Sequence, residues 1–362
     1  MVQSENLISV LMGVYNEEAH IVPAVKSILN QTYRNFELLI VDDGSTDRTP
    51  ELLDRLAATD SRVKVLHESN KGLTKSLNQL FALSRGSMIA RMDADDVAYP
   101  TRFELQMQYL LRHPQVGVLS SWSNLMTDAG NCTVCYCYPD NHDWVLKCFQ
   151  TGYNPITHAA TMIRRTLLEN LDGPYRFKYS QDLDLWLRLR SYTKFGIVQR
   201  FLLASRNHAN RLSAQNLEMR RQLDDLIRKV NNDPGQNGAE WDWMAEEARI
   251  VAAMKASATT VEQRAHQSYI EALALEAQHA EPGLIRQHLR ASMQKPDLRG
   301  KALIRYLFTW LPRGWLSWVL GLAPDRRLIW QHHHALKDVV SPEEYEQLTS
   351  YWKQLNNYQS EP

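Results

Sequence analysis

Residues 7–42 read LISVLMGVYNEEAHIVPAVKSILNQTYRNFELLIVD, which is a strand pattern, a helix pattern and a second strand pattern in succession. The strand segments 7–14 and 36–41 are almost continuously apolar, as strands covered on both faces are. Between them a helix is predicted near Ala19–Leu29. A helix that joins two such strands indicates a right-handed crossover and a parallel strand pair.

The same alternation continues along the chain and predicts the rest of a sheet. Further helix and strand patterns occur at Thr49–Ala58, 62–68, Leu73–Ser84 and 88–92. From Gly117 to His208 the strand patterns follow one another less regularly, with one helix pattern in QDLDLWLRLRS. We therefore predict an α/β fold with a mixed, mainly parallel sheet and helices on both faces.

The second half of the chain has a different pattern. After Arg211 no strand pattern recurs, and the turn-rich stretch NNDPGQNG at 231–238 is typical of a linker. Helix patterns fill the remainder, so an all-helical C-terminal region is predicted. The expected division is a domain over 1–210, a helix and linker over 211–240, and a helical region over 241–362.

Composition narrows the possible partners. The 362 residues include 41 Lys and Arg against 41 Asp and Glu, so the formal net charge is zero. Without a positive field over the whole molecule, nucleic acid is not expected as a partner. The N-terminus MVQSENLISVLMGVYNEE lacks a basic stretch followed by a purely apolar core, so no signal peptide is predicted and we expect a cytoplasmic protein.

Four cysteines, Cys132, Cys135, Cys137 and Cys148, raise the question of a zinc site. The segment CTVCYCY is β-branched and aromatic, and it has no Gly or Pro to form a turn that presents ligands. In a strand, Cys132 would face away from Cys135 and Cys137. Reduced cysteines in a cytosolic strand are therefore the preferred interpretation.

Negative charge is concentrated where one strand pattern ends, in MDADD at 92–96. Asp93, Asp95 and Asp96 repel one another, so their proximity costs stability unless solvent or a cation offsets the charge. Polar motifs follow the strand patterns at 14–18, 41–47 and 92–96. Because parallel strands bind ligands at their carboxyl ends, these motifs are expected to converge on one crevice.

Eight motifs in order carry a resemblance to a known family. They are GVYNEE, SILNQTYRNFELLIVDDGSTDRT, NKGLTKSLN, SRGSMIARMDADDVAYPTRFELQ, HPQVGVLSS, NPITHAATMIRR, QDLDLWLRL and SRNHANRLS. Over residues 7–210 the chain resembles family-2 glycosyltransferases with the GT-A fold. The resemblance implies transfer of a sugar from a nucleotide diphosphate donor with inversion. Within the domain we expect a nucleotide-binding part, 1–116, and an acceptor and base part, 117–210.

The acidic cluster suits this chemistry. In an extended Asp93-Ala94-Asp95 segment both carboxylates point to one side. A divalent cation on the pyrophosphate would act as a Lewis acid, and hard oxygen ligands suit Mg²⁺ or Mn²⁺. By the family pattern, Asp95 is expected to bind the metal and Asp93 the donor. Asp96 is a neighbour of the site that could cap the following turn.

The resemblance also assigns the nucleotide pocket. It places Asp43 at the nucleobase, with Val14, Tyr15 and Glu17 lining the same pocket. The segment VDDGSTD has a local interpretation as well, an Asx turn and helix N-cap, and both can hold together. Lys75 begins a predicted helix and is either a donor contact or a solvated charge.

An inverting transfer needs one general base. By resemblance that base is Asp182, and Asp184 is the reserve candidate. Gln181 stands where the family commonly has Glu, so it can hydrogen-bond to a neighbour but adds no charge. The alternative is that both acids simply favour the first turn of a helix whose apolar residues, Trp186 among them, anchor it.

Histidines are candidates at three places. His158 matches a recurrent family position and is expected to be a neighbour of the site. His208 falls where some relatives supply a further metal ligand, with surface exposure as the alternative. His332–His334 is expected to be a solvated helical stretch.

The stretch 302–330 holds four of the ten tryptophans. Its apolar runs are about ten residues each, too short for the roughly twenty that a spanning helix needs. The tryptophans and arginines suit a helix in the headgroup region of a membrane. A helical bundle with buried tryptophans is the alternative, and the sequence does not separate the two.

Together these observations predict an inverting, metal-dependent glycosyltransferase of hexosyl or hexosaminyl type. A UDP sugar is the favoured donor, and a glycan or lipid-linked hydroxyl is the expected acceptor. By resemblance it would act in surface polysaccharide biosynthesis, in the cytoplasm or peripherally on the cytoplasmic face of the inner membrane. The alternatives are a noncatalytic nucleotide-sugar-binding module, suggested by Gln181, and a sugar nucleotidyltransferase. The latter class has a glycine-rich loop after its first strand, which GVYNEEAH is not.

Overall fold

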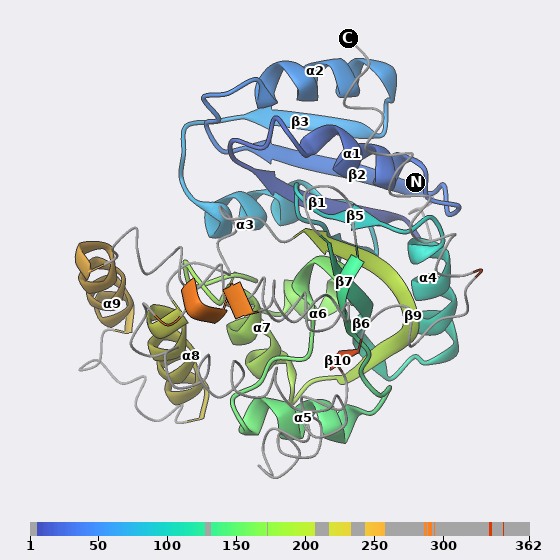
Figure 1. Cartoon of the computed structure of the whole chain (residues 1–362). Helices are drawn as coiled ribbons and strands as arrows, with labels where there is room; N and C mark the ends of the chain where they lie inside the picture. The colour runs from blue at the N-terminus through green and yellow to red at the C-terminus, as the bar shows by residue number, and fades with distance from the viewer. Residues whose placement is uncertain are drawn as a thin grey trace.

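In the computed structural model, the described residues form one curved, ten-stranded sheet flanked by helices (Figure 1). The residues that the structure describes are 6–126, 132–171, 173–206, 217–232, 243–257, 286–287, 289–291, 293, 333–334 and 343. The strands are β1 (Ile8–Val14), β2 (Phe36–Asp42), β3 (Val63–His67), β4 (Met88–Arg91), β5 (Val97–Ala98), β6 (Val116–Met126), β7 (Cys132–Tyr136), β8 (Met162–Arg164), β9 (Lys194–Arg206) and β10 (His333–His334). Their order is β10-β7-β6-β8-β4-β1-β2-β3, and β9 pairs with β5 and β6.

The N-terminal half of the sheet is parallel, as the sequence predicts. Strands β4, β1, β2 and β3 lie side by side, with Ile8 opposite both Phe36 and Met88. The helices between them are α1 (Ile21–Leu29), α2 (Thr49–Thr59) and α3 (Leu73–Leu83), and α4 (Arg102–Arg112) follows β5. Their crossovers place the carboxyl ends of β1, β2 and β4 at one edge of the sheet.

Alternate residues of β1 enter two different cores. Val10 and Met12 pack in a core with residues of α1, α2 and α4. Leu11 packs on the opposite face, in a core with residues of α3. This alternation is what a strand buried on both faces requires, and it confirms the prediction of helices on both faces of the sheet.

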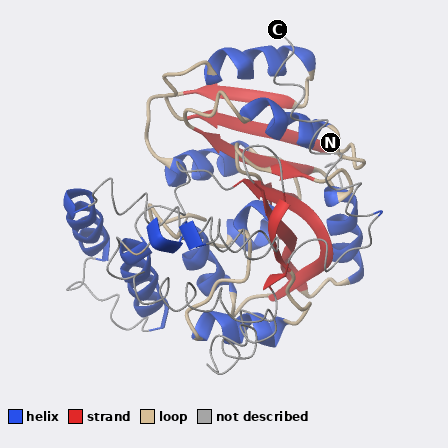
Figure 2. Ribbon diagram, in the orientation of Figure 1, coloured by secondary structure: helices blue, strands red, loops and turns tan. Residues whose placement is uncertain are grey.

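Residues 116–206 extend the same sheet with mixed pairing. Strand β8 lies antiparallel between β4 and β6. The long, curved β9 is parallel to β6 and antiparallel to the two-residue β5 (Figures 1 and 2). The helical elements here are α5 (His142–Gln150), the 3₁₀ turn η1 (His158–Ala160), α6 (Arg165–Glu169) and α7 (Gln181–Leu189). The expected mixed, mainly parallel sheet is thus confirmed.

Two further helices, α8 (Leu217–Asn232) and α9 (Trp243–Ser257), follow the sheet. Leu223 and Ile227 of α8 join the core that holds α7. Helix α8 continues through the first two residues of the predicted linker at 231–238, and the rest of that linker lies outside the described residues. The stretch 302–330, predicted to be interfacial or bundled, also lies outside them.

The expectation of a helical stretch at His332–His334 is wrong for its last two residues. His333 and His334 form β10, antiparallel to Tyr136 and Cys135 of β7. The edge of β7 offers backbone groups that a passing segment can pair with, whatever its local helix propensity. In the described part of the chain, no helix is both long and apolar enough to cross a bilayer.

A buried arginine fixes the end of β4. Arg102, the first residue of α4, is fully buried, and its Nη2 donates to the carbonyls of Arg91 at 2.8 Å and Thr161 at 3.3 Å. Its Nε donates to Gln106 at 3.2 Å, and Gln106 donates in turn to the carbonyl of Ala160 at 2.7 Å. These bonds tie α4 to the last residue of β4 and to η1.

Arg102→Ala is expected to lower the free energy of unfolding by about 3 to 5 kcal/mol, because it leaves buried carbonyls unpaired and opens a cavity. Urea denaturation measures this change. Arg112→Ala, at the exposed end of the same helix, is the matched control and should change stability by less than about 0.5 kcal/mol. Equal losses for the two variants would contradict the anchoring role of Arg102.

Candidate active site

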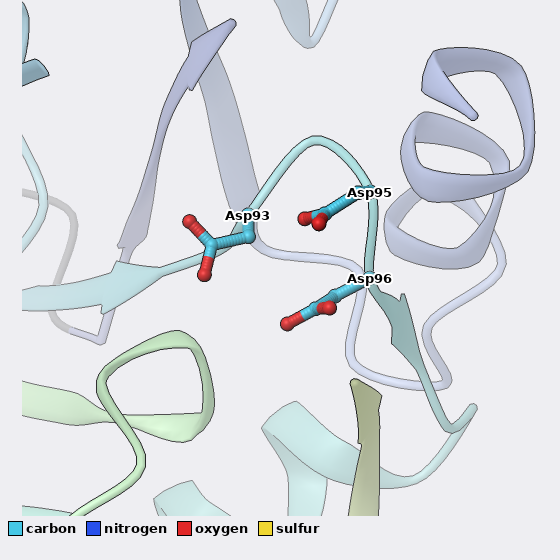
Figure 3. A group of neighbouring side chains, drawn as sticks. All are labelled: Asp93, Asp95 and Asp96. Atoms are coloured by element: carbon cyan, nitrogen blue, oxygen red, sulfur yellow. The ribbon is translucent and has the colours of Figure 1, made fainter. Parts of the chain in front are cut away.

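Three carboxylates gather in the loop that joins β4 to β5. The ligand oxygens of Asp93, Asp95 and Asp96 all lie within 4.8 Å of one another. Figure 3 shows Asp95 and Asp96 on one limb of the loop, with their side chains directed toward the limb that carries Asp93. Asp93 and Asp95 are partly exposed, whereas Asp96 is 1% exposed. The predicted acidic cluster is therefore one compact group.

Asp96 is held by the end of β9. Both of its carboxylate oxygens accept from the hydroxyl of Ser205 at 3.1 Å, and one accepts from the backbone N–H of Arg206 at 2.9 Å. The Nε of Arg206 donates to the carbonyl of Asp95 at 3.0 Å. Asp96 thus fastens the loop to β9, and Asp93 and Asp95 are the members of the cluster that face solvent.

A buried cation stands beside the cluster. Arg91, the last residue of β4, is 2% exposed and forms an ion pair with Asp93 and a bond to the carbonyl of Met92. Its Nε has no hydrogen-bond partner among the described residues. Sequence reasoning missed Arg91, although a charged residue that ends an apolar strand directly before three acids is a usable signal.

The loops after β1 and β2 interlock. The hydroxyl of Ser45 accepts from the backbone N–H of Asn16 at 2.9 Å, and Asn16 Oδ1 accepts from the N–H of Thr46 at 2.7 Å. The N–H of Glu17 donates to the hydroxyl of Thr49 at 2.9 Å. The predicted convergence of these two strand ends is therefore present in the structure.

The residues assigned to the nucleotide pocket lie at this edge. Asp43 is 5% exposed, and its backbone N–H donates to the carbonyl of Val14 at 2.9 Å. Tyr15 is 49% exposed, and Glu17 is half-buried with its carboxylate against His20 at 2.9 Å. Lys75 is exposed in the first turn of α3.

Asp182 and Asp184 have different surroundings at the start of α7. Asp182 Oδ2 accepts from the side-chain amide of Asn154 at 3.0 Å. Asp184 is fully buried and pairs with Arg176 and with Arg188, the latter at 3.0 Å. A third donor, the amide of Asn231, reaches Asp184 at 3.0 Å. The contacts of Asp184 are those of a structural anchor, which favours Asp182 over the reserve candidate as a reactive group.

His158, Tyr175 and Trp186 pack together as one aromatic group. His158 Nε2 lies 3.1 Å from the hydroxyl of Tyr175, and the ring of Trp186 packs edge-on to His158 at 5.8 Å. Burial, together with the charge of Arg91, lowers the pKa of His158 to about 3, so His158 is neutral.

The phenol of Tyr175 is buried and has a shifted pKa. Burial raises the pKa of its phenol, the positive charge of Arg91 lowers this pKa in part, and the negative charges of Asp182 and Asp93 raise it again. Gln181, the residue before Asp182, is buried at the first position of α7. His208, the expected further metal ligand, lies outside the described residues.

The three cysteines whose side chains the structure describes lie outside this group. Cys135, Cys137 and Cys148 are buried free thiols, and burial raises the pKa of Cys137 and of Cys148 to about 12. Within the described ranges, the acidic loop is the group of three or more residues with metal-ligand geometry.

Comparison with known proteins identifies the family. The family model described as "Glycosyl transferase family 2" matches residues 9–171. An uncharacterized glycosyltransferase of Methanocaldococcus jannaschii is 30% identical over 221 residues, which are 58% of this chain and 76% of the relative. The O-antigen biosynthesis glycosyltransferase WbnJ of Escherichia coli is 31% identical over 185 residues, 51% of this chain and 72% of WbnJ.

Among solved structures, a fragment of S. aureus TarS in complex with UDP-GlcNAc superposes with a TM-score of 0.50. The two chains are 15% identical, and the match covers 87% of this chain and 92% of the fragment, so the likeness concerns the fold. The chain belongs to glycosyl transferase family 2, and its curled, mainly parallel sheet is a GT-A fold. It is a glycosyltransferase.

His67 is a titratable residue that bonds to Asp42 at the end of β2, directly before the loop that carries Asp43. Its Nδ1 lies 2.9 Å from Asp42, which is buried, and its Nε2 lies 3.1 Å from Asp54. The hydrogen bond to Asp42, with a smaller contribution from Asp54, raises the pKa of His67 above its usual value. Asp42 also accepts from the backbone N–H of Ser45 at 3.1 Å, so this pair supports the loop that carries Asp43.

Because the pKa of His67 is higher in the folded than in the unfolded chain, its stabilising contribution is complete below about pH 6.5 and is lost as pH rises through the folded pKa. The stability difference between wild type and His67→Ala should therefore be larger at pH 5.5 than at pH 8.5 in urea denaturation. His142, whose pKa is lowered by burial, is the contrasting control, since its contribution should be lost as pH falls. A difference at His67 that grows toward high pH would refute this coupling.

Proposed function

We propose that this glycosyltransferase moves a sugar from a nucleoside diphosphate donor, with a UDP sugar favoured, to a hydroxyl of a glycan or lipid-linked acceptor, with inversion at the anomeric carbon. The observation that carries the proposal is the acidic loop after β4, where the ligand oxygens of Asp93, Asp95 and Asp96 lie within 4.8 Å of one another. In this proposal the acidic loop after β4 holds the donor, and the start of α7 holds the acceptor hydroxyl.

In this proposal Asp182 is the general base. It takes the proton from the acceptor hydroxyl, whose oxygen forms the new bond to the anomeric carbon while the bond from that carbon to the diphosphate breaks. The hydrogen bond from Asn154 orients the carboxylate and leaves its other oxygen for the acceptor. One base is sufficient for an inverting displacement.

The acidic loop fits a divalent cation. Asp95 would hold Mg²⁺ or Mn²⁺ through its partly exposed carboxylate, because hard oxygen ligands suit both ions, and Asp93 would contact the donor. Asp96, which is occupied by Ser205 and Arg206, would support the loop. When bound, the cation would neutralise the charge that develops on the leaving diphosphate. His208 is the proposed additional ligand.

The donor's nucleoside would lie at the carboxyl ends of β1 and β2. Asp43 is proposed to contact the base, with Val14, Tyr15 and Glu17 lining the pocket. The exposed ring of Tyr15 suits stacking on a nucleobase. Lys75 is proposed as a donor contact, because it is an exposed cation in the first turn of α3, the helix whose start Asp43 holds in place.

The biological setting is proposed from relatives. WbnJ is named for O-antigen biosynthesis, which supports surface polysaccharide as the product. We propose that the chain acts on the cytoplasmic face of the membrane, with 302–330 at the interface. We also propose 1–116 as the nucleotide part and 117–210 as the acceptor part of the catalytic domain, followed by the linker and helical region.

The two alternative functions differ from the proposed one in the compound that the protein consumes. A noncatalytic module would bind nucleotide sugars without consuming them, and a nucleotidyltransferase would consume a nucleoside triphosphate. A thermal-shift panel of UDP, GDP and dTDP sugars with Mn²⁺, followed by turnover assays with and without acceptor, separates these outcomes. A UDP sugar that raises the melting temperature most and is turned over supports the proposal.

Asp95→Ala should weaken UDP binding in the presence of Mn²⁺ and abolish transfer, because the lost ligand acts through the cation. In EDTA the variant and the wild type should bind UDP equally. Isothermal calorimetry with and without metal measures this. Asp143→Ala, which removes an exposed acid on α5, is the control. Equal affinities of variant and wild type under both conditions would remove Asp95 from the metal site.

Asp182→Asn should lower kcat by about a hundred- to ten-thousandfold with little change in UDP affinity or stability, because general-base catalysis typically contributes that much. Asp184→Asn should instead lower the melting temperature, since it weakens a buried pair with two arginines. Single-turnover transfer, calorimetry and thermal denaturation distinguish the two variants. If Asp182→Asn keeps wild-type kcat, Asp182 is not the base.

A further inference from the structure

Helix α3 begins at the proposed nucleotide pocket. The carboxylate of Asp43 accepts from the backbone N–H groups of Lys71 at 2.6 Å and Gly72 at 2.8 Å. Gly72 adopts φ 89°, which lets the chain turn into the helix at this point. The start of α3 is therefore set by the carboxylate that the proposed function places at the nucleobase.

The same helix reaches the segment that leads to the proposed base. Asn78 Nδ2 donates to the carbonyl of Tyr175 at 2.8 Å, and the N–H of Tyr175 donates to Asn78 Oδ1 at 3.0 Å. One turn earlier, the hydroxyl of Thr74 donates to the carbonyl of Phe177 at 2.6 Å. Asn78 thus satisfies both backbone groups of a residue 97 positions later, as a paired strand would.

Segment 173–180 and α7 behave as one unit. Arg188 of α7 donates to the carbonyl of Gly173 at 3.1 Å and to that of Pro174. Arg176 of the segment pairs with Asp184 of α7. Ser180, directly before α7, has φ 50°, a strained conformation for a residue with a side chain that surrounding contacts must maintain. Moving the segment would therefore move Asp182.

We propose that Asn78 is a positioning residue that sets the place of Asp182 relative to the donor. The inference rests on the proposed function, in which Asp43 contacts the nucleotide and Asp182 receives the acceptor proton. Binding of the nucleotide at the start of α3 orders the helix, and the two bonds of Asn78 fix the segment that carries the base. Binding of the donor thereby fixes the place of Asp182 in the acceptor site.

Asn78→Ala should reduce transfer about ten- to a hundredfold, because a shift of about 1 Å in a reacting group costs roughly that much in rate. The Kd for UDP with Mn²⁺ should stay within about twofold of wild type, since no donor contact is removed. The matched control is Gln79→Ala, which removes the neighbouring carboxamide and its bond to Glu68, and should leave transfer unchanged. The proposal is overturned if both variants lose transfer activity equally. It is also overturned if Asn78→Ala loses affinity for UDP while Gln79→Ala keeps it.

Hydrogen exchange gives a second measurement that does not depend on activity. In the protein without ligand, the amide of Tyr175 should exchange faster in Asn78→Ala than in wild type. With UDP and Mn²⁺, wild type should gain protection over 173–180, whereas the variant should gain it near Lys71 and Gly72 alone. Thr74→Val, a nearly isosteric change, should shift exchange and transfer in the same direction by less.

Two failures can be told apart. If wild type neither binds UDP nor transfers sugar, the proposed function fails. If wild type does both while Asn78→Ala exchanges and transfers like wild type, the role of Asn78 fails.

Discussion

The carboxylate of Asp96 joins parts of the chain that are 109 residues apart. A buried charge is stable only when strong hydrogen bonds replace its lost hydration. Ser205 and Arg206 supply those bonds, so the acidic loop and the end of β9 are stable together rather than separately. The loop is then held in a shape that leaves Asp93 and Asp95 partly exposed at the sheet edge.

The charges around the site are arranged so that each acid has a distinct environment. Arg91 balances Asp93, and its charge with burial keeps His158 neutral. Asp184 is enclosed by two guanidinium groups and an amide, whereas Asp182 receives an amide hydrogen bond from Asn154. Two acids two residues apart can therefore differ in role, because their partners come from different segments of the fold.

The sequence allows the parallel half of the fold to be predicted, since each apolar strand and amphipathic helix is defined by local pattern. Helix α3, predicted over Leu73–Ser84, spans Leu73–Leu83. The mixed half is less predictable: β8 has three residues, and its place between β4 and β6 depends on pairings far along the chain. β10 shows the same limitation, because it pairs with the edge strand β7 where the sequence predicts a helical stretch.

At the site, acidic residues in recognisable motifs could be found from the sequence. Asp93, Asp95 and Asp182 are of this kind. Arg91 was missed although its place before three acids is a local signal, whereas Asn78 could not be found in this way, since a bond to a distant backbone leaves no local pattern. Sequence reasoning therefore supplied candidate reacting groups and omitted the residues that hold them in place.

The bond between Asp96 and β9 also has a consequence for synthesis of the protein. Strands β1 to β4 can pair soon after they leave the ribosome, but Asp96 has to wait for Ser205 and Arg206. At about 5 to 20 residues per second, that interval is on the order of 5 to 20 s. During it the nascent chain carries the parallel strands β1 to β4 with an unfastened acidic loop. The acidic loop is thus fastened only after the parallel half of the sheet has been made, and a chain that stops short of Ser205 and Arg206 would lack the bonds that hold it.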